Sequence, residues 1–167
     1  MSLNELLINH KDTIHKRWLE LIFDTYPPDA TGFLRNKKNP FGNPVGAALR
    51  DGTTIILDEL CGDMNGEQVS LGLDRIIRIR AVQEFHPSQA VAFVFLLKNA
   101  IADKIGAELA ALDARDGLFD LWAKIDRLAL AAFDVHMECR ETVNRIRLSE
   151  ARKRMELYGG NKSDNKR

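Results

Sequence analysis

The sequence is poor in the features that mark several large classes of protein. Only two of its 167 residues are cysteines, Cys61 and Cys139, and they lie far apart in the chain. Such sparse cysteine fits a reducing cytoplasm and not a disulfide-stabilised fold. Lys and Arg together number 24, as do Asp and Glu, so the basic excess of a nucleic-acid-binding domain is missing. We expect a cytoplasmic domain without a nucleic-acid partner.

Long apolar runs and catalytic motifs are missing as well. The longest apolar run covers residues 90–97, far short of the roughly 18 residues that span a membrane. The sequence contains no nucleophile elbow, phosphate-binding loop, dinucleotide fingerprint, CxxC pair or HExxH motif. We therefore expect no membrane span, no enzymatic activity, no metal and no cofactor.

What the first half does contain is helical periodicity. A first helix is predicted from Ser2, which has capping-box spacing to Glu5, to the prolines at positions 27 and 28. Its apolar face consists of Leu7, Ile14, Trp18 and Ile22. After a loop, Asn43 followed by Pro44 predicts the start of the next helix. Within that helix, "TTII" (53–56) is the one segment where a strand competes, but no alternating partner segment appears elsewhere.

Proline and glycine divide the second half into helices. The turn "CGDMNG" (61–66) precedes a helix predicted to end at about Phe85. Pro87 has no N–H to donate and suits the first turn of a helix, so a new helix is predicted from Pro87 to about residue 112. After a turn at 113–117, residues 118–157 contain neither Gly nor Pro, which predicts one helix of about 40 residues.

These elements predict a single all-α domain. We expect a bundle of about five or six helices, with a globin-like arrangement as one option, and a long coiled-coil-like helix at its C-terminal end. The bundle should span residues 1–135 and the extension of the last helix residues 136–158. The polar residues 159–167 are predicted to form a disordered tail.

The last helix carries a narrow apolar seam with a period of seven. Its members are Trp122, Ile125, Ala129, Ala132, His136, Cys139, Val143 and Ile146. Such a repeat is typical of coiled coils and predicts a homodimer formed through this helix.

A group of polar residues flanks the predicted break before Pro87. It consists of Arg78, Arg80, His86, Gln89 and Lys98. Free N–H groups at a helix start favour negative charge, so these residues are candidates for binding an anion or a protein partner. Replacing Arg78 and Arg80 with alanine should then leave stability nearly unchanged. The alternative is that these Arg and Lys side chains have no binding role and only reach from two apolar helices to solvent.

His136 leaves three further hypotheses open. Together with Cys139 at i+3 it could bind a metal, although two ligands do not make a site. A histidine that faces the core of a helical bundle could also bind haem. A phosphorylatable histidine is the third hypothesis. In each case the competing interpretation is that His136 and Cys139 only pack in the seam.

Several segments resemble a known family. They are "TYPPD" (25–29), "NPFGNPVGAAL" (39–49) and "RIRAVQEFHPSQAVAFVFLLK" (78–98), the last being the most specific. Over about residues 10–150 the chain resembles the N-terminal domains of RsbRD-type proteins, regulators related to the RsbR sensors of the bacterial stressosome. The resemblance implies a helical, dimeric signal-input domain that is related to globin-like sensors but lacks haem.

In that family the domain precedes an output domain, such as a STAS domain or a histidine kinase. No output domain lies within these 167 residues, so we expect it in a longer protein or in a partner. The leading hypothesis is a non-enzymatic sensory domain that dimerises. The alternatives are a haem- or metal-binding helical sensor and an adaptor that docks onto a larger complex.

Overall fold

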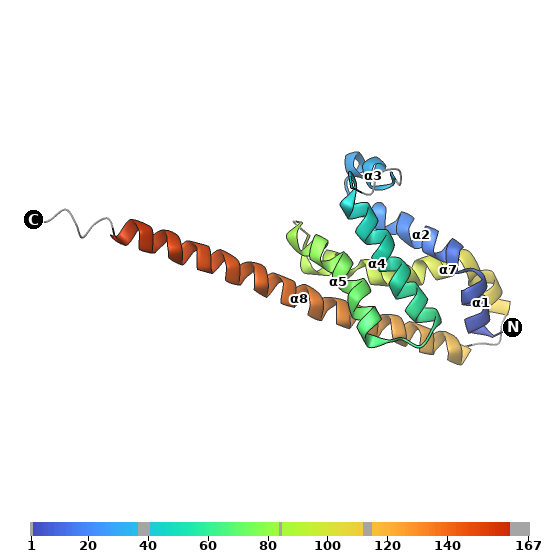
Figure 1. The fold of residues 1–167 in the computed structure, drawn as a ribbon. Coiled ribbons are helices and arrows are strands. Elements are labelled where there is room, and N and C mark those ends of the chain that lie inside the picture. Colours follow the sequence, from blue (N-terminus) through green and yellow to red (C-terminus); the bar gives the residue numbers. More distant parts are fainter. Residues whose placement is uncertain (1, 37–40, 84, 112–114, 161–167) are drawn as a thin grey trace, which may run out of the picture.

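The described part of the chain is entirely helical. The computed structural model describes residues 2–36, 41–83, 85–111 and 115–160, which form eight helices and no strand (Figure 1). The helices are α1 (Leu3–Asn9), α2 (Lys11–Phe23), α3 (Pro28–Leu34), α4 (Pro44–Cys61), α5 (Gly66–Val82), α6 (Pro87–Val91), α7 (Phe93–Ala111) and α8 (Arg115–Gly160). The all-α prediction is confirmed, and "TTII" lies inside α4. None of the described helices is long and apolar enough to cross a membrane.

Side-chain caps set the ends of several helices as the sequence predicts. The Ser2 hydroxyl accepts from the Glu5 N–H at 3.2 Å, and the Glu5 carboxylate accepts from the Ser2 N–H at 2.7 Å. The Asn43 side-chain oxygen accepts from the Gly46 N–H, and its amide donates to three carbonyl groups of the segment that ends α3. Asn43 therefore fixes α3 against the start of α4.

Two predicted helices are interrupted. The first is broken at His10, where the backbone dihedrals (φ −106°, ψ 9°) separate α1 from α2. The second, predicted to run from Pro87 to about residue 112, is broken at Ala92, which separates α6 from α7. At this break the indole N–H of Trp18 donates to the carbonyl of Phe93 at 2.7 Å. The second interruption thus coincides with a contact between α2 and α7, which the periodicity of the sequence does not predict.

The core lies where α2, α4, α5 and α7 pack against one another and against the first half of α8. Two glycines bring α4 and α5 close together. A Cβ added at Gly52 would lie 2.7 Å from the carbonyl oxygen of Gly72 and 2.6 Å from the Ile76 side chain. Only glycine lets the two helix backbones approach this closely.

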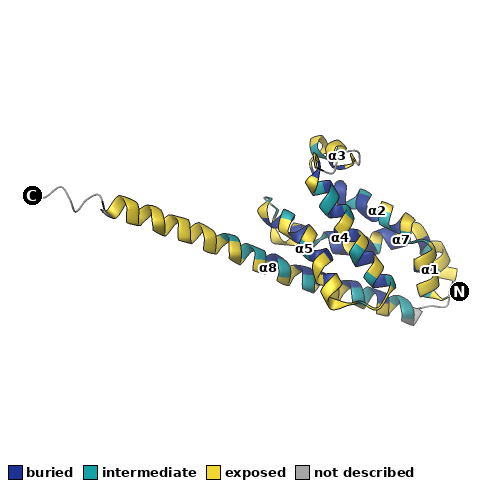
Figure 2. Ribbon diagram, in the orientation of Figure 1, coloured by how far each residue is buried: buried dark blue, intermediate teal, exposed yellow. Residues whose placement is uncertain are grey.

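The last helix crosses the bundle and then leaves it. α8 contains 46 residues, and Figure 2 shows that its first half is partly buried and its second half exposed. Residues 141–159 are exposed apart from the half-buried Val143. The long C-terminal helix is therefore confirmed. It extends to Gly160, so residues 159 and 160 of the predicted tail (159–167) belong to the helix, and the rest of that tail lies outside the described residues.

Candidate functional site

Arg80 is the most unusual residue at the predicted break. It lies in the last turn of α5 with none of its surface exposed. Its guanidinium carbon lies 4.9 to 5.5 Å from the centroids of three aromatic rings, those of Phe85, Tyr26 and Phe93. The rings present their negative faces to the cation, an arrangement that stabilises a buried guanidinium.

The polar contacts of Arg80 are few for a buried cation. It donates to the Gln89 carbonyl at 3.0 Å and to the Thr25 hydroxyl at 3.1 Å, and its Nε–H is buried without an acceptor. No ion pair among the described residues includes Arg80. Burial lowers the pKa of the Arg80 guanidinium, and the nearby Tyr26 partly offsets this. The structure thus holds a cation in its core without a carboxylate, which costs free energy that the rings and hydrogen bonds must offset.

Arg80 joins the four segments around the break. Thr25 and Tyr26 follow α2, Phe85 precedes α6, Gln89 lies in α6 and Phe93 begins α7. We call Arg80 and these five residues the arginine junction. The junction also lies next to α8, because the carbonyl of Ala81 accepts a long hydrogen bond of 3.5 Å from Arg140.

The predicted binding residues do not converge on one cavity. Gln89 connects Arg80 with His86, since its side chain accepts from the His86 N–H at 3.1 Å. Arg78 is exposed and donates to Asp74 at 2.6 Å. Lys98 donates to an α8 carboxylate, Asp126, at 2.6 Å and lies over the Phe95 and Trp122 rings. A binding role for the five residues stays a prediction, and the structure makes Arg80 a core residue.

The predicted seam of α8 has two environments. Ile125, Ala129, Ala132 and His136 are buried against the protein's own bundle, and half-buried Trp122 and Cys139 pack at its edge. Buried residues cannot contact a second chain, which revises the predicted dimer seam. Of the remaining seam residues, Val143 is half-buried beside α5, and Ile146 is 55% exposed on the free part of the helix.

His136 lies near the point where α8 leaves the bundle. It is 1% exposed, and its Nδ1 atom is buried without a hydrogen-bond partner. Burial, and secondarily the charge of Arg140, lowers the pKa of His136. Within the part of the chain that the structure describes, no three His, Cys, Asp or Glu residues lie together as a metal site would need.

A cavity of about 370 Å³ lies between α5 and α8 at this point. Arg78 and Asp74 line it from α5, and Cys139 and Val143 line it from α8. Sequence reasoning assigned Arg78 to the break and Cys139 and Val143 to the seam. The structure shows that the two predicted sites meet where α8 leaves the bundle.

The fold and these contacts can now be compared with known proteins. The family model described as "RsbT co-antagonist protein rsbRD N-terminal domain" matches residues 12–151. The chain belongs to this family. No curated protein and no solved structure matches the chain. The resemblance noted over about residues 10–150 is confirmed, and the family indicates a regulatory sensor domain related to the stressosome.

The match to the rsbRD N-terminal domain covers the arginine junction and the exit of α8. Sequence reasoning missed the aromatic half of the junction, although one signal was present. Arg80 follows Ile76 and Ile77 at i+4 and i+3 and therefore shares their buried face, whereas Arg78 does not. The spacing distinguishes the buried arginine from the exposed one.

Proposed function

We propose that this rsbRD N-terminal domain is a cytoplasmic, non-enzymatic sensor that dimerises and passes a signal along α8. The receiver would be an output domain or partner protein of the STAS or histidine kinase type. The main support for the proposal is the contact between the C-terminal end of α5 and α8. The arginine junction and the Arg140 contact lie on adjacent residues, Arg80 and Ala81.

This adjacency supports a mechanical link. A change at the break between α5 and α7 alters the environment of Arg80, and hence the position of the Ala81 carbonyl that Arg140 contacts. Packed interfaces shift between discrete arrangements and do not deform continuously. A shift of α5 would therefore move the base of α8.

The free part of α8 supports dimerisation. Several of its large apolar side chains are 55 to 80% exposed: Ile146, Leu148, Met155, Leu157 and Tyr158. A helix of this length without tertiary contacts is marginally stable in water unless it packs on a partner. A second copy related by two-fold symmetry would cover Val143 and Ile146 from both chains.

Light scattering on the purified chain tests the dimer. Wild type should be a dimer at micromolar concentration, and the double variant Val143→Glu, Ile146→Glu should be at least partly monomeric with unchanged helical circular dichroism. Like charges facing each other across a helix pair oppose association. The matched control is Asn144→Glu with Ala151→Glu, which adds two glutamates seven residues apart on a face away from the seam and should remain dimeric.

A monomeric wild type would refute the dimer. The non-enzymatic part of the proposal has its own test on the same preparation, incubation with labelled ATP in the presence and absence of a histidine kinase. Because His136 is 1% exposed, it should accept no phosphate. Labelled His136 would contradict the proposal.

A further inference from the structure

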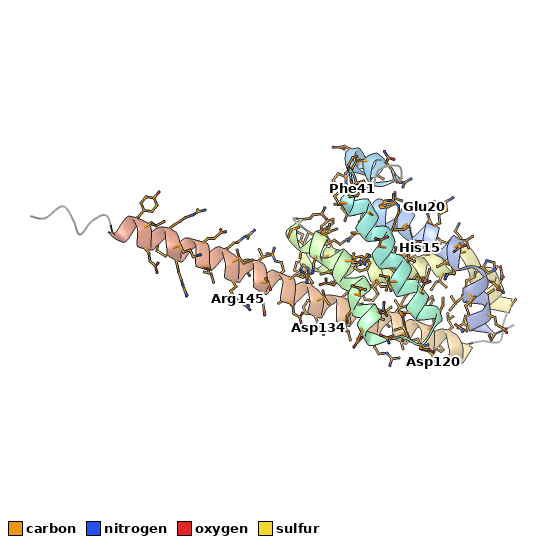
Figure 3. The ribbon with its side chains drawn as sticks, in the orientation of Figure 1. His15, Glu20, Phe41, Asp120, Asp134 and Arg145 are labelled. Atoms are coloured by element: carbon orange, nitrogen blue, oxygen red, sulfur yellow. The ribbon has the colours of Figure 1, made fainter. Side chains whose placement is uncertain are left out.

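A second cavity lies on another side of the bundle, between α2, α4 and the residue that follows α3. Its volume is about 450 Å³, within the range of small-molecule sites. Leu19 and Phe23, both buried, contribute apolar surface to it. Figure 3 labels His15 and Glu20, which line the cavity from α2. A cavity with an apolar wall and several charged groups suits a small amphipathic molecule.

Arg50 is the residue that defines the chemistry of this cavity. Its guanidinium lies over the Phe23 ring at 5.6 Å and donates to the Leu34 carbonyl at 2.8 Å. Its Nε–H is buried without an acceptor. No ion pair among the described residues includes Arg50, and burial lowers its pKa. A half-buried guanidinium that is not paired with a carboxylate of the protein is favourable for a bound carboxylate.

The other charged groups leave the cavity with a positive excess. Lys16, Arg35 and Arg50 are cations, and Asp12 and Glu20 are the carboxylates. Arg35 pairs with Asp24 outside the cavity lining, at 2.8 Å, and Glu20 lies 3.6 Å from Arg17. The balance favours a ligand with negative charge.

We propose that this cavity binds a small monocarboxylate with an apolar body. The carboxylate would accept hydrogen bonds from Arg50, and the apolar body would lie against Leu19 and Phe23. The same class of ligand would be the signal that the sensor detects, a consequence that rests on the proposed function. Binding itself does not depend on it.

The position of the cavity connects it with the arginine junction. Phe23 is the last residue of α2, and its carbonyl accepts from the Tyr26 N–H at 3.1 Å. Tyr26 in turn packs against Arg80. A ligand that held Arg50 and Phe23 would thus act one turn away from the residues that contact the end of α5.

Nuclear magnetic resonance of the full chain tests the proposal with two probes of similar size. Sodium benzoate and benzyl alcohol would be titrated at constant ionic strength while the Nε–H signal of Arg50 is followed. Benzoate should shift this signal saturably, and benzyl alcohol should bind at least about tenfold more weakly because it lacks the charge. Sodium phosphate should also bind more weakly, since it has no apolar body to lie against Leu19 and Phe23.

Two variants locate the binding. Arg50→Gln should weaken benzoate binding by about tenfold or more, followed by the backbone signals of α2. Arg75→Gln is the matched control, because Arg75 is exposed and pairs with Asp51 next to Arg50; its affinity should stay within about twofold of wild type. The comparison of the probes uses wild type alone, so it stands even if R50Q does not fold.

Three results would overturn the inference: no saturable shift with benzoate, equal binding of benzyl alcohol, or tighter binding of phosphate. Its failure can be distinguished from failure of the proposed function. A dimer that does not bind benzoate would end the inference and leave the proposed signalling along α8 intact. A monomer that binds benzoate would support the cavity and refute the dimeric sensor.

Discussion

Replacing Arg80 with alanine should destabilise the domain strongly, in contrast to the sequence-based expectation for this residue. The change removes a fully buried side chain from contact with three aromatic rings. It also leaves the Gln89 carbonyl and the Thr25 hydroxyl without their donor. Arg78→Ala, two residues away on the same helix, removes only an exposed i, i+4 ion pair with Asp74.

The magnitude follows from opposing effects. Truncating a large buried side chain costs about 2–5 kcal/mol through lost contacts and the cavity left behind. Each lost hydrogen bond adds about 1 kcal/mol or more. Removing a buried cation that has no counter-ion returns part of this cost. We expect a net loss of about 3 kcal/mol for Arg80→Ala, or about 6–12 °C in melting temperature for a chain of this size.

Thermal and urea unfolding followed by circular dichroism measure the effect. Arg80→Met separates packing from charge, because methionine fills much of the volume without a charge or a donor. The expected order of destabilisation is Arg80→Ala, then Arg80→Met, then Arg78→Ala, the last within about 0.5 kcal/mol of wild type. If Arg80→Ala were as stable as Arg78→Ala, the reasoning about the arginine junction would be wrong.

Two further predictions concern helix packing and pH. Gly52→Ala should destabilise the domain by about 1–3 kcal/mol in urea unfolding, because the added Cβ would lie 2.7 Å from the Gly72 carbonyl oxygen. Gly106→Ala should stabilise the domain by about 0.5–1 kcal/mol, because no neighbouring atom lies within 4 Å of the added Cβ. The opposite order of stabilities would contradict the close contact of α4 and α5. Stability should fall as the pH drops below about 6.5, because the lowered pKa of His136 lets the unfolded chain bind a proton that the folded chain does not. His136→Gln should reduce this pH dependence, and an equal slope in both proteins would refute the assignment.

The sequence predicted the helices better than their interruptions. Signals that act within one or two turns were sufficient for the caps at Ser2 and Asn43 and for the helix start at Pro87. The breaks at His10 and Ala92 carry no proline or glycine. At Ala92 the Trp18 indole donates to the next residue's carbonyl, a contact between residues 75 positions apart. Such long-range contacts cannot be read from local spacing.

The seam shows a second limit of periodicity. A repeat of seven indicates that one face of a helix is covered along its length, but not whether the cover comes from the same chain. In α8 the bundle covers Ile125 and Ala132, while Ile146 remains exposed. The repeat is continuous in sequence because one helical face serves both environments, and only the fold shows where the first ends.

The proposed transmission of a signal along α8 depends on the change of environment along this helix. Arg140 contacts α5 at the end of the covered part, and about 20 residues follow to Gly160. At 1.5 Å per residue this free part is about 30 Å long, so a tilt of about 5° at its base would displace its end by about 3 Å. Side chains that interdigitate between two helices cannot accommodate such a displacement without repacking. In the proposed dimer, a small shift of the α5 carbonyl that Arg140 contacts would therefore change the pairing of the two α8 helices at their far ends more than at their bases. The far ends are where the proposed output domain would receive the change.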